Sequence, residues 1–359
     1  MSHPVFKIIN SEGCQSYLIG CPETREALLV DPKVGREGLY QAMLEHYDLK
    51  LVAVLDSHTH ADHLSASTRL CGPRVELLMS HRTPVDRPMR KLAEGDEVEL
   101  GNLRFQVLEV PGHTPDSLAL YGEGLLFSGD SLFIGGLARA DFVGSDPALL
   151  FESVRSQLLS LPGETLVLPG HGYNDILFST IDAEKQLNEA LQFPDGEAYA
   201  KSLNATPGAG NSEGVNANLK LNLEREPELP ESPGNVAACC ASPGGGTKVS
   251  IEEAHASRGQ AIRDSLASPG QWVDVRDPFE YAHGRIPGTT NIPLSELGFH
   301  LDELRTGDPL YLSCRSGVRS MTAAKTLQRL GIATHPVNIG GGILGWQDQG
   351  FAIEGQPAT

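Results

Sequence analysis

The feature that most constrains this chain is HTHADH at residues 58–63, which places four metal-competent side chains within six residues. The motif follows an apolar run of strand length, residues 50–57, and precedes a stretch with a helical pattern. Alternate side chains of an extended chain point the same way, so His58 and His60 can converge on one point. Strand ends that lead into helices are where α/β folds place their chemistry. The motif therefore predicts a metal site at the end of a sheet.

Three further side chains, His113, Asp130 and His171, each follow an apolar run and lie in a glycine-containing turn. Backbone freedom in such turns lets a side chain face a shared cleft. These residue types leave two chemistries open. A zinc hydrolase would use all seven side chains for two ions that share Asp130 and activate a bridging hydroxide. A mononuclear iron enzyme would use two histidines and one carboxylate, leaving positions for dioxygen and substrate.

The set and its order resemble the metallo-β-lactamase superfamily, over residues 1 to about 193. The resemblance implies an αββα sandwich with a metal at the strand ends. FSGDSLFIGGLARADF, LPGHGYNDILFSTIDAEKQLN and ANLKLNL resemble the persulfide dioxygenase branch, whose members bind one Fe(II) through His-His-Asp. This implies one Fe(II) per chain, held by His58, His113 and Asp130, with O2 and glutathione persulfide as substrates. The side chains implied to orient ligands and waters are His60, Asp62, His63 and His171.

The resemblance also implies a glutathione site and shows where this chain departs from it. Arg139 and Tyr173 match positions that line that site, and Arg139 could pair with a substrate carboxylate. Leu137 and Ala138 stand where relatives carry Cys-Gly or Val-Gly, and Asp116 stands where glycine is usual. We therefore expect no cysteine relay beside the iron, and a substrate orientation that can differ from that of the relatives.

A second candidate site is the loop CRSGVR, residues 314–319, between an apolar run and a helical pattern. A strand–loop–helix turn points backbone N–H groups into a nest that stabilises an anion, so we expect Cys314 to be a thiolate. The loop residues expected to contact a substrate such as the sulfonate of thiosulfate are Arg315, Ser316, Gly317, Val318 and Arg319. The cysteines without such a setting, for which no role is expected, are Cys14, Cys21, Cys71, Cys239 and Cys240.

Together with WVDVRDPFEYAHGRIPGTTNIP and NIGGGILGW, this loop resembles a single rhodanese domain covering about residues 249–359. Its six-residue length favours a sulfur acceptor over a phosphate ester, because related phosphatases have a roomier loop. Alternating strands and helices predict a small parallel sheet. The expected elements are helices at residues 251–266, 278–282 and 318–330, and strands at 272–275, 310–313 and 336–339.

The length of 359 residues predicts two domains. Proline, glycine and serine cluster in residues 194–247, which are interpreted as an arm that becomes a linker. We expect a metallo-β-lactamase-like persulfide dioxygenase domain at residues 1–230. A Gly/Pro/Ser-rich linker is expected at residues 231–248, followed by the rhodanese domain at residues 249–359.

The combination resembles bacterial persulfide dioxygenase–rhodanese fusion proteins, and a homodimer is implied by the same resemblance. Thiosulfate would transfer its outer sulfur to Cys314 and release sulfite, and glutathione would leave as the persulfide that the first domain oxidises. Two alternatives stay open. A dinuclear zinc thioesterase resembling glyoxalase II could be fused to a sulfurtransferase, although residues 194–247 look too short and broken for that family's helical domain. The C-terminal domain could also be a sulfur-carrier or binding module without turnover.

The net charge of −18 makes nucleic acid and anionic membranes poor partners. No apolar run approaches the ~18 residues that span a bilayer. Residues 1–20 lack a basic region followed by an apolar stretch, so no secretory signal is expected. Six scattered cysteines without a CxxC pair indicate reduced thiols and a cytoplasmic location.

Overall fold

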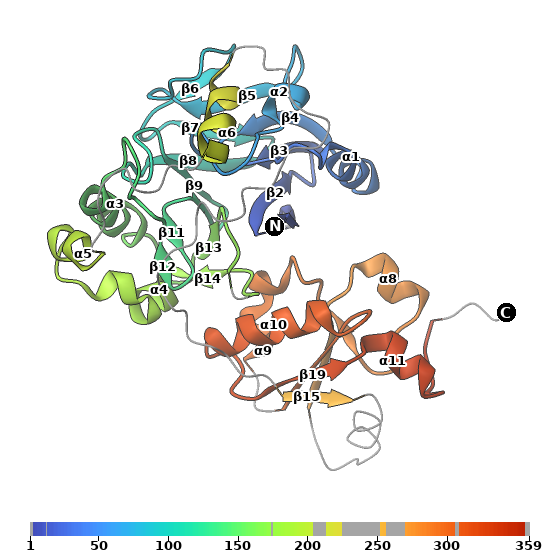
Figure 1. Ribbon diagram of the computed structural model, residues 1–359. Coiled ribbons are helices and arrows are strands. Elements are labelled where there is room, and N and C mark those ends of the chain that lie inside the picture. Colours follow the sequence, from blue (N-terminus) through green and yellow to red (C-terminus); the bar gives the residue numbers. More distant parts are fainter. Residues whose placement is uncertain are drawn as a thin grey trace. The chain divides into compact units, whose positions relative to one another are not determined.

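A computed structural model describes residues 3–11, 13–173, 175–203, 213–224, 252–255, 270–305 and 309–355 (Figure 1). The chain divides into two compact units, which are described separately: residues 1–173 with 179–246, and residues 174–178 with 247–359. The predicted linker at residues 231–248, with Cys239 and Cys240, lies outside the described residues. Among the helices of the described ranges, none has the length and apolar character needed to cross a membrane.

The first unit is built on two six-stranded sheets. The first sheet runs in the order β1 (Val5–Ser11), β2 (Cys14–Gly20), β3 (Glu26–Val30), β4 (Lys50–Leu55), β5 (Glu76–Ser80) and β6 (Arg90–Leu92). The second runs in the order β14 (Ser179–Thr180), β13 (Leu166–Pro169), β10 (Leu125–Gly129), β9 (Leu118–Gly122), β8 (Leu103–Glu109) and β7 (Glu97–Leu100). A separate hairpin pairs β11 (Leu132–Phe133) with β12 (Gly136–Leu137).

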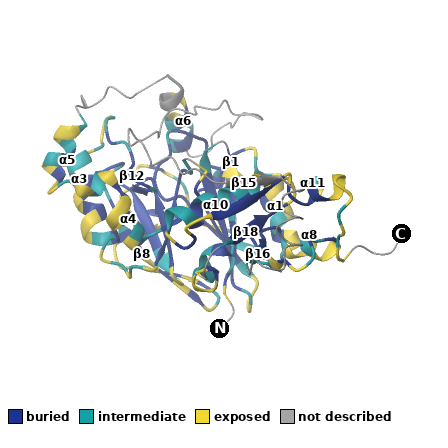
Figure 2. Ribbon diagram, turned by 90° about the horizontal axis from the view of Figure 1, so that it is seen from below, coloured by how far each residue is buried: buried dark blue, intermediate teal, exposed yellow. Residues whose placement is uncertain are grey.

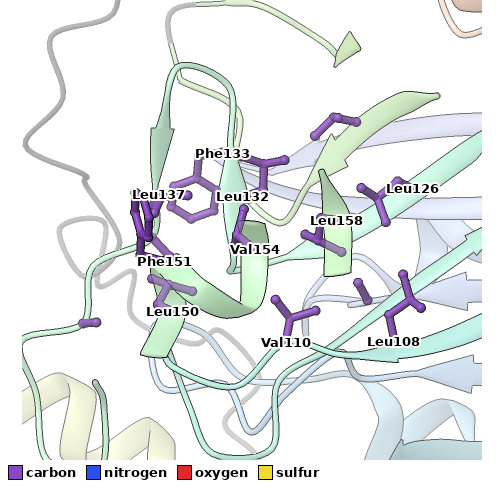
Figure 3. Close-up of a cluster of buried hydrophobic side chains, with 14 of the residues drawn as sticks. Leu108, Val110, Leu126, Leu132, Phe133, Leu137, Leu150, Phe151, Val154 and Leu158 are labelled. Atoms are coloured by element: carbon purple, nitrogen blue, oxygen red, sulfur yellow. The ribbon is translucent and has the colours of Figure 1, made fainter. Parts of the chain in front are cut away.

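Aromatic side chains join the inner faces of the two sheets, where Phe127 packs against Phe6 and Tyr17 with ring centroids 6.1 and 5.2 Å apart. Helices cover the outer faces. Helix α1 (Glu37–His46) packs Tyr40 and Leu44 against the first sheet. Helix α3 (Pro147–Ser153) and a π-helical turn at Val154–Leu158 pack on the second sheet (Figure 3). The predicted αββα sandwich is confirmed.

The second unit contains a sheet in which every pairing between the described strands is parallel. The order is β15 (Glu252–His255), β19 (Pro336–Gly340), β18 (Leu310–Ser313), β16 (Gln271–Asp274) and β17 (Thr290–Asn291). The helices are α8 (Pro278–His283), α9 (Leu301–Leu304), α10 (Val318–Arg329) and α11 (Gly342–Asp348), with a 3-10 turn at Leu297–His300. The predicted rhodanese-type parallel sheet is therefore confirmed.

Three sequence-based expectations need correction. Residues 252–255 of the predicted helix 251–266 form β15, because pairing with β19 satisfies their backbone groups; the other residues of that helix lie outside the described part. The expected arm at 194–247 contains α5 (Gly196–Ser202) and α6 (Glu213–Leu223). The stretch with a helical pattern after HTHADH forms only the short helix α2 (Ser67–Leu70), and α4 (Ile181–Leu187) ends before a 3-10 turn at Glu189–Gln192. Figure 2 shows that the sheets are largely buried while α3, α4 and α5 keep exposed residues.

Candidate functional site

The ends of four strands bring the predicted metal ligands together in the first unit. HTHADH follows β4, and the later ligands follow β8, β10 and β13. One donor atom each from His58, His113 and Asp130 lies within 4.8 Å of the others, and all three residues are buried. The sequence-predicted triad is thus one cluster of two imidazoles and a carboxylate.

Hydrogen bonds determine which ring nitrogens of this cluster can bind a metal. The Ser57 hydroxyl donates to Asp31 Oδ2 (2.8 Å), so the His58 Nδ1, 3.1 Å from that hydroxyl oxygen, carries the proton and donates. His113 Nδ1 donates to the Arg139 carbonyl oxygen at 2.8 Å. Both tautomers leave Nε2 with a lone pair, which is the form a metal ligand requires. Burial and neighbouring His60 lower the pKa of His58 to about 3, so the imidazole is neutral.

The surroundings of the Asp130 carboxylate show whether these residues fit a metal ion. Burial would raise its pKa, but His171 and the other histidines hold the pKa far below its usual range, so the group is a carboxylate. Its Oδ2 atom is buried and has no hydrogen-bond partner, although His171 Nε2 is 3.3 Å away and His113 Nε2 is 3.7 Å away. An unpaired buried carboxylate oxygen is costly unless a cation compensates it. The donor set therefore fits a metal ion.

The remaining predicted residues surround this triad. His60 Nε2 lies 3.1 Å from Asp31 Oδ1, and His63 Nδ1 lies 2.8 Å from Asp62 Oδ2. Burial alone would lower the pKa of His63, but Asp62 raises this pKa well above its usual value. His58, His60 and Asp62 also form a group of potential ligands. Geometry alone therefore accommodates either one ion or two.

Three residues that sequence reasoning missed hold the HTHADH loop in place. Asp31, at the end of β3, accepts hydrogen bonds from Ser57 N (2.7 Å) and from the Ser57 hydroxyl. Asp116 accepts from the Thr59 backbone N–H (3.1 Å) and hydroxyl (2.6 Å). The sequence indicated Asp116, because it stands where glycine is usual, whereas no local sequence pattern indicated Asp31.

The third residue, Asn222 of α6, bonds the loop through both ends of its amide. Nδ2 donates to the carbonyl oxygens of His60 and His63, both at 2.8 Å, and Oδ1 accepts from Ser65 N at 3.1 Å. The neighbouring Asn218 donates to the Asp62 carbonyl oxygen at 3.1 Å. Helix α6 is therefore part of the site.

Replacing Asn222 with alanine is expected to weaken metal binding by about 10- to 100-fold, because two loop carbonyl groups lose their donor. Chelator competition measures the change. Asn188→Ala is the matched control, since Asn188 is also buried and donates to Gly136 O, but has no bond to the loop. Equal losses of metal affinity in both variants would contradict the assigned role of Asn222.

Arg139 and Tyr173, which are expected to contact glutathione, each interact with another residue of the chain. The Arg139 guanidinium forms a two-atom ion pair with Asp141, at 2.6 and 2.9 Å. A substrate carboxylate would compete with Asp141 for it. Tyr173 stacks on the His171 ring with centroids 5.9 Å apart. The backbone carbonyl of Arg139, which orients His113, is a contribution that the sequence did not indicate.

A thiol lies near the HTHADH loop, although positions 137 and 138 carry none. Leu137 and Ala138 are buried in the hydrophobic core, as their side chains require. Cys14, however, lies at the start of β2, and its thiol is 3.5 Å from Asp62 Oδ2. Burial would raise the pKa of this thiol, but hydrogen bonds with His171 and His63 lower it to about 7.

In the second unit, Cys314 lies between β18 and α10. Its Sγ accepts hydrogen bonds from Gly317 N (3.1 Å) and the Ser320 hydroxyl (3.3 Å). Gly317 adopts φ 94°, a left-handed conformation that favours glycine and turns its N–H toward the sulfur. Arg315, Ser316 and Val318 are exposed around the buried cysteine. One backbone N–H of the loop, that of Gly317, therefore points at the sulfur.

The arginines of this unit differ in whether a carboxylate of the protein pairs with them. Arg319 forms a two-atom pair with Glu280 at 2.7 and 2.8 Å, so its guanidinium is engaged by the protein. Burial would raise the pKa of Glu280, but Arg319 lowers it. Arg276 pairs with buried Asp274 at 2.7 Å, so its charge is balanced within the protein. Exposed Arg315 is the loop cation best placed for a substrate anion.

The NIGGGILGW segment contacts the cysteine loop. Ile343 N donates to the Cys314 carbonyl oxygen at 2.8 Å. A Cβ at Gly342 would lie 2.2 Å from that same oxygen, so only glycine allows α11 to approach so closely. Gly342 therefore allows the close contact between α11 and the cysteine loop.

Comparison with known proteins gives a family match for each of the two units. Residues 10–171 match the Metallo-beta-lactamase superfamily, and residues 259–349 match the Rhodanese-like domain. The chain is 31% identical over 180 residues to "Persulfide dioxygenase ETHE1, mitochondrial" of Mus musculus, covering 49% of this chain and 70% of the relative. It is 34% identical over 185 residues to a "Hydroxyacylglutathione hydrolase" of Nitrosococcus oceani, covering 49% and 69%.

Solved structures agree with these matches. The crystal structure of ETHE1 from Myxococcus xanthus is 33% identical, with a TM-score of 0.56, and the similarity covers 60% of this chain and 98% of that one. A metallo-beta-lactamase from Staphylococcus aureus is 24% identical with a TM-score of 0.57, covering 94% and 100%. The second likeness concerns the fold alone.

Proposed function

Because the chain belongs to the metallo-beta-lactamase superfamily and carries a C-terminal rhodanese-like domain, we propose that it is a bifunctional enzyme of sulfur metabolism. The first domain, residues 1–230, oxidises glutathione persulfide with O2 to sulfite and glutathione. Residues 231–248 link it to the rhodanese domain, residues 249–359. That domain moves sulfane sulfur between thiosulfate and glutathione.

The observation that carries the first activity is the buried triad of His58, His113 and Asp130, with its unpaired Asp130 Oδ2. One Fe(II) bound there would supply open positions for a sulfur ligand and for O2, and the redox chemistry that joins them. The protein supplies the orientation. Ser57 and Arg139 fix the tautomers of the two histidines, and Asp116 and Asn222 fix the loop that carries the first of them. Rigid ligands favour a defined arrangement of both reactants.

The second activity is supported by the Cys314 loop. The Cys314 sulfur attacks the outer sulfur of thiosulfate, the S–S bond breaks, and sulfite leaves with the bonding electron pair. Glutathione thiolate then attacks the outer sulfur of the Cys314 persulfide, forming glutathione persulfide and restoring the Cys314 thiolate. The Gly317 N–H stabilises the sulfur anion in both steps, and exposed Arg315 attracts the sulfonate.

A second candidate for the first domain is a dinuclear zinc thioesterase. The hydroxyacylglutathione hydrolase relatives favour it, as does His171, whose Nε2 lies 3.4 Å from Asp62 Oδ2 and 3.3 Å from Asp130 Oδ2. Helices α5 and α6 also weaken the argument that residues 194–247 are too broken to be helical. Both candidates would take a glutathione derivative as substrate.

Metal analysis of anaerobically purified protein, combined with oxygen-electrode measurements on glutathione persulfide, distinguishes the two. We expect about one iron per chain and oxygen uptake that depends on the persulfide. Two zinc ions per chain, hydrolysis of a glutathione thioester and no oxygen uptake would instead establish the thioesterase. Protein that binds no iron and stays inert after anaerobic reconstitution would overturn the dioxygenase proposal.

A further inference from the structure

A groove in the second unit is formed by residues of α8, of α11 and of the cysteine loop. Its volume is about 420 Å³, within the range of about 300–1,000 Å³ that holds small ligands. The backbone N–H of Leu344 in α11 donates to the Arg315 carbonyl oxygen at 3.1 Å, and both residues line the groove. The groove therefore begins at the residue that follows Cys314.

Large apolar side chains line this groove from both helices. Phe279 of α8 is 48% exposed and Leu344 of α11 is 43% exposed. Ile343, which also lines the groove, is buried in the hydrophobic core of the second unit. Single exposed apolar side chains need no explanation, but two in one concave site beside a reactive cysteine indicate a ligand that covers them. Part of the surface of that ligand is therefore apolar.

The charged groups of the groove leave one cation for a ligand. Arg276 is paired with Asp274 at 2.7 Å, and Glu280 is paired with Arg319 at the same distance. Arg315 is exposed, and no carboxylate of the described residues pairs with it. A ligand of the groove is therefore expected to carry an anionic group at the end next to Arg315.

His283 and Gln347 give the groove hydrogen-bonding groups. His283 Nδ1 donates to the Phe279 carbonyl oxygen at 2.6 Å, so the neutral ring keeps Nε2 as an acceptor. Gln347 is exposed, and its amide can both donate and accept. Such groups suit the N–H and C=O groups of a peptide. A small peptide-like anion with apolar segments fits all these features, and glutathione, with its peptide groups, carboxylates and methylene groups, is such a molecule.

We propose that the groove between α8 and α11 is the subsite that binds glutathione when it accepts sulfur from Cys314. This inference rests on the proposed sulfur transfer and assigns to it residues outside the cysteine loop. Phe279 and Leu344 contact the methylene groups of glutathione, and Arg315 pairs with one of its carboxylates. Because sulfite leaves before glutathione binds, Arg315 can serve the sulfonate of thiosulfate first and this carboxylate afterwards.

Binding in the groove places the acceptor for the second step of the transfer. The glutathione thiol loses its proton to solvent, and the thiolate attacks the outer sulfur of the Cys314 persulfide. The S–S bond breaks, and Cys314 leaves as the thiolate with the bonding electron pair. Holding the tripeptide along the groove aligns its sulfur with that bond and lowers the entropic part of the barrier.

Steady-state kinetics of the full-length protein with two acceptors test this subsite. Cyanide takes sulfur from the Cys314 persulfide as thiocyanate, but is too small to contact both helices. Sulfite release from thiosulfate is measured with each acceptor. In Phe279→Ala and in Leu344→Ala, we expect the ratio of kcat/KM for glutathione to kcat/KM for cyanide to fall by about 10-fold, through a higher KM for glutathione. Leu39→Ala, which changes a helical leucine that is 45% exposed, should leave the ratio unchanged.

A ratio that stays at the wild-type value in both groove variants would overturn the subsite, and is the result expected if the groove binds a protein acceptor instead. An equal fall with both acceptors would also overturn it, because damage to the cysteine loop affects every acceptor. Wild-type transfer to cyanide without transfer to glutathione would reject the subsite but retain a sulfurtransferase. Transfer to neither acceptor would contradict the proposed activity, and this subsite with it.

Discussion

Replacing Cys314 with serine is expected to reduce sulfur transfer from thiosulfate to glutathione by on the order of 10³-fold or more. A serine hydroxyl is a weak nucleophile at its ordinary pKa, and the loop around Cys314 supplies no base beside it. The protein contacts that stabilise the sulfur, from Gly317 N and Ser320, remain but have no anion to stabilise. Sulfite release from thiosulfate and glutathione measures the loss. Oxygen consumption with supplied glutathione persulfide should stay at the wild-type rate.

The control for this variant is Cys71→Ser, which changes a half-buried thiol of the first unit and should keep both activities. Loss of both activities in Cys314→Ser would show that the two sites are not separable. Full retention of thiosulfate-dependent transfer would instead support the alternative in which the second domain only carries or docks a partner. Comparing the two assays on one preparation also verifies that the chain has folded.

Elements with a strong local pattern could be predicted from the sequence. Residues 103–110 and 310–313 are apolar runs bounded by turn residues, a pattern that predicts strands, and they form β8 and β18. Helix α8 begins where proline and the acidic pair Asp277 and Glu280 predict a helix start, and Asp277 N donates to Glu280 at 3.3 Å. These signals lie within a few residues of the structure that they specify.

The helices missed in the expected arm depend instead on distant contacts. Helix α5 begins at an Asp195 side chain that accepts from Ala198 N, and its Tyr199 ring stacks on Phe151 at 5.6 Å. Asn222 of α6 bonds loop residues more than 150 positions earlier in the chain. Proline- and glycine-rich composition around them favours a linker, and packing overrides that local preference.

The same distinction holds for the candidate site. Its metal-competent side chains could be identified because HTHADH is compact and the other ligands follow strands. Asp31 and Cys14 could not, since they reach the loop only through the strand register and the approach of the two sheets. Arg319 has a partner that its motif does not indicate, because Glu280, 39 residues earlier, pairs with both of its terminal nitrogens.

Replacing Asp130 with alanine is expected to remove iron and to abolish persulfide-dependent oxygen uptake while sparing sulfur transfer at Cys314. The carboxylate is the only anionic member of the triad, and burial leaves no water-exposed group to replace it. Without it, His58 and His113 would hold a dication with two neutral ligands in a low-dielectric site, which is unfavourable. Iron content per chain and oxygen-electrode rates measure the effect, and His113→Ala should reproduce it.

Asp182→Ala is the matched control, because Asp182 is exposed and its 3.9 Å pair with Lys185 is a contact worth little. The rhodanese activity serves in every variant as an internal measure of folding of the second unit. Iron retained by Asp130→Ala at the wild-type level would place the metal elsewhere among the histidines and would contradict the triad. Loss of oxygen uptake with unchanged iron would mean that Asp130 acts on the substrate rather than on the metal. Loss of both iron and oxygen uptake in Asp130→Ala, with sulfur transfer intact, is the result that assigns the ion to this carboxylate and the oxygen chemistry to the first domain.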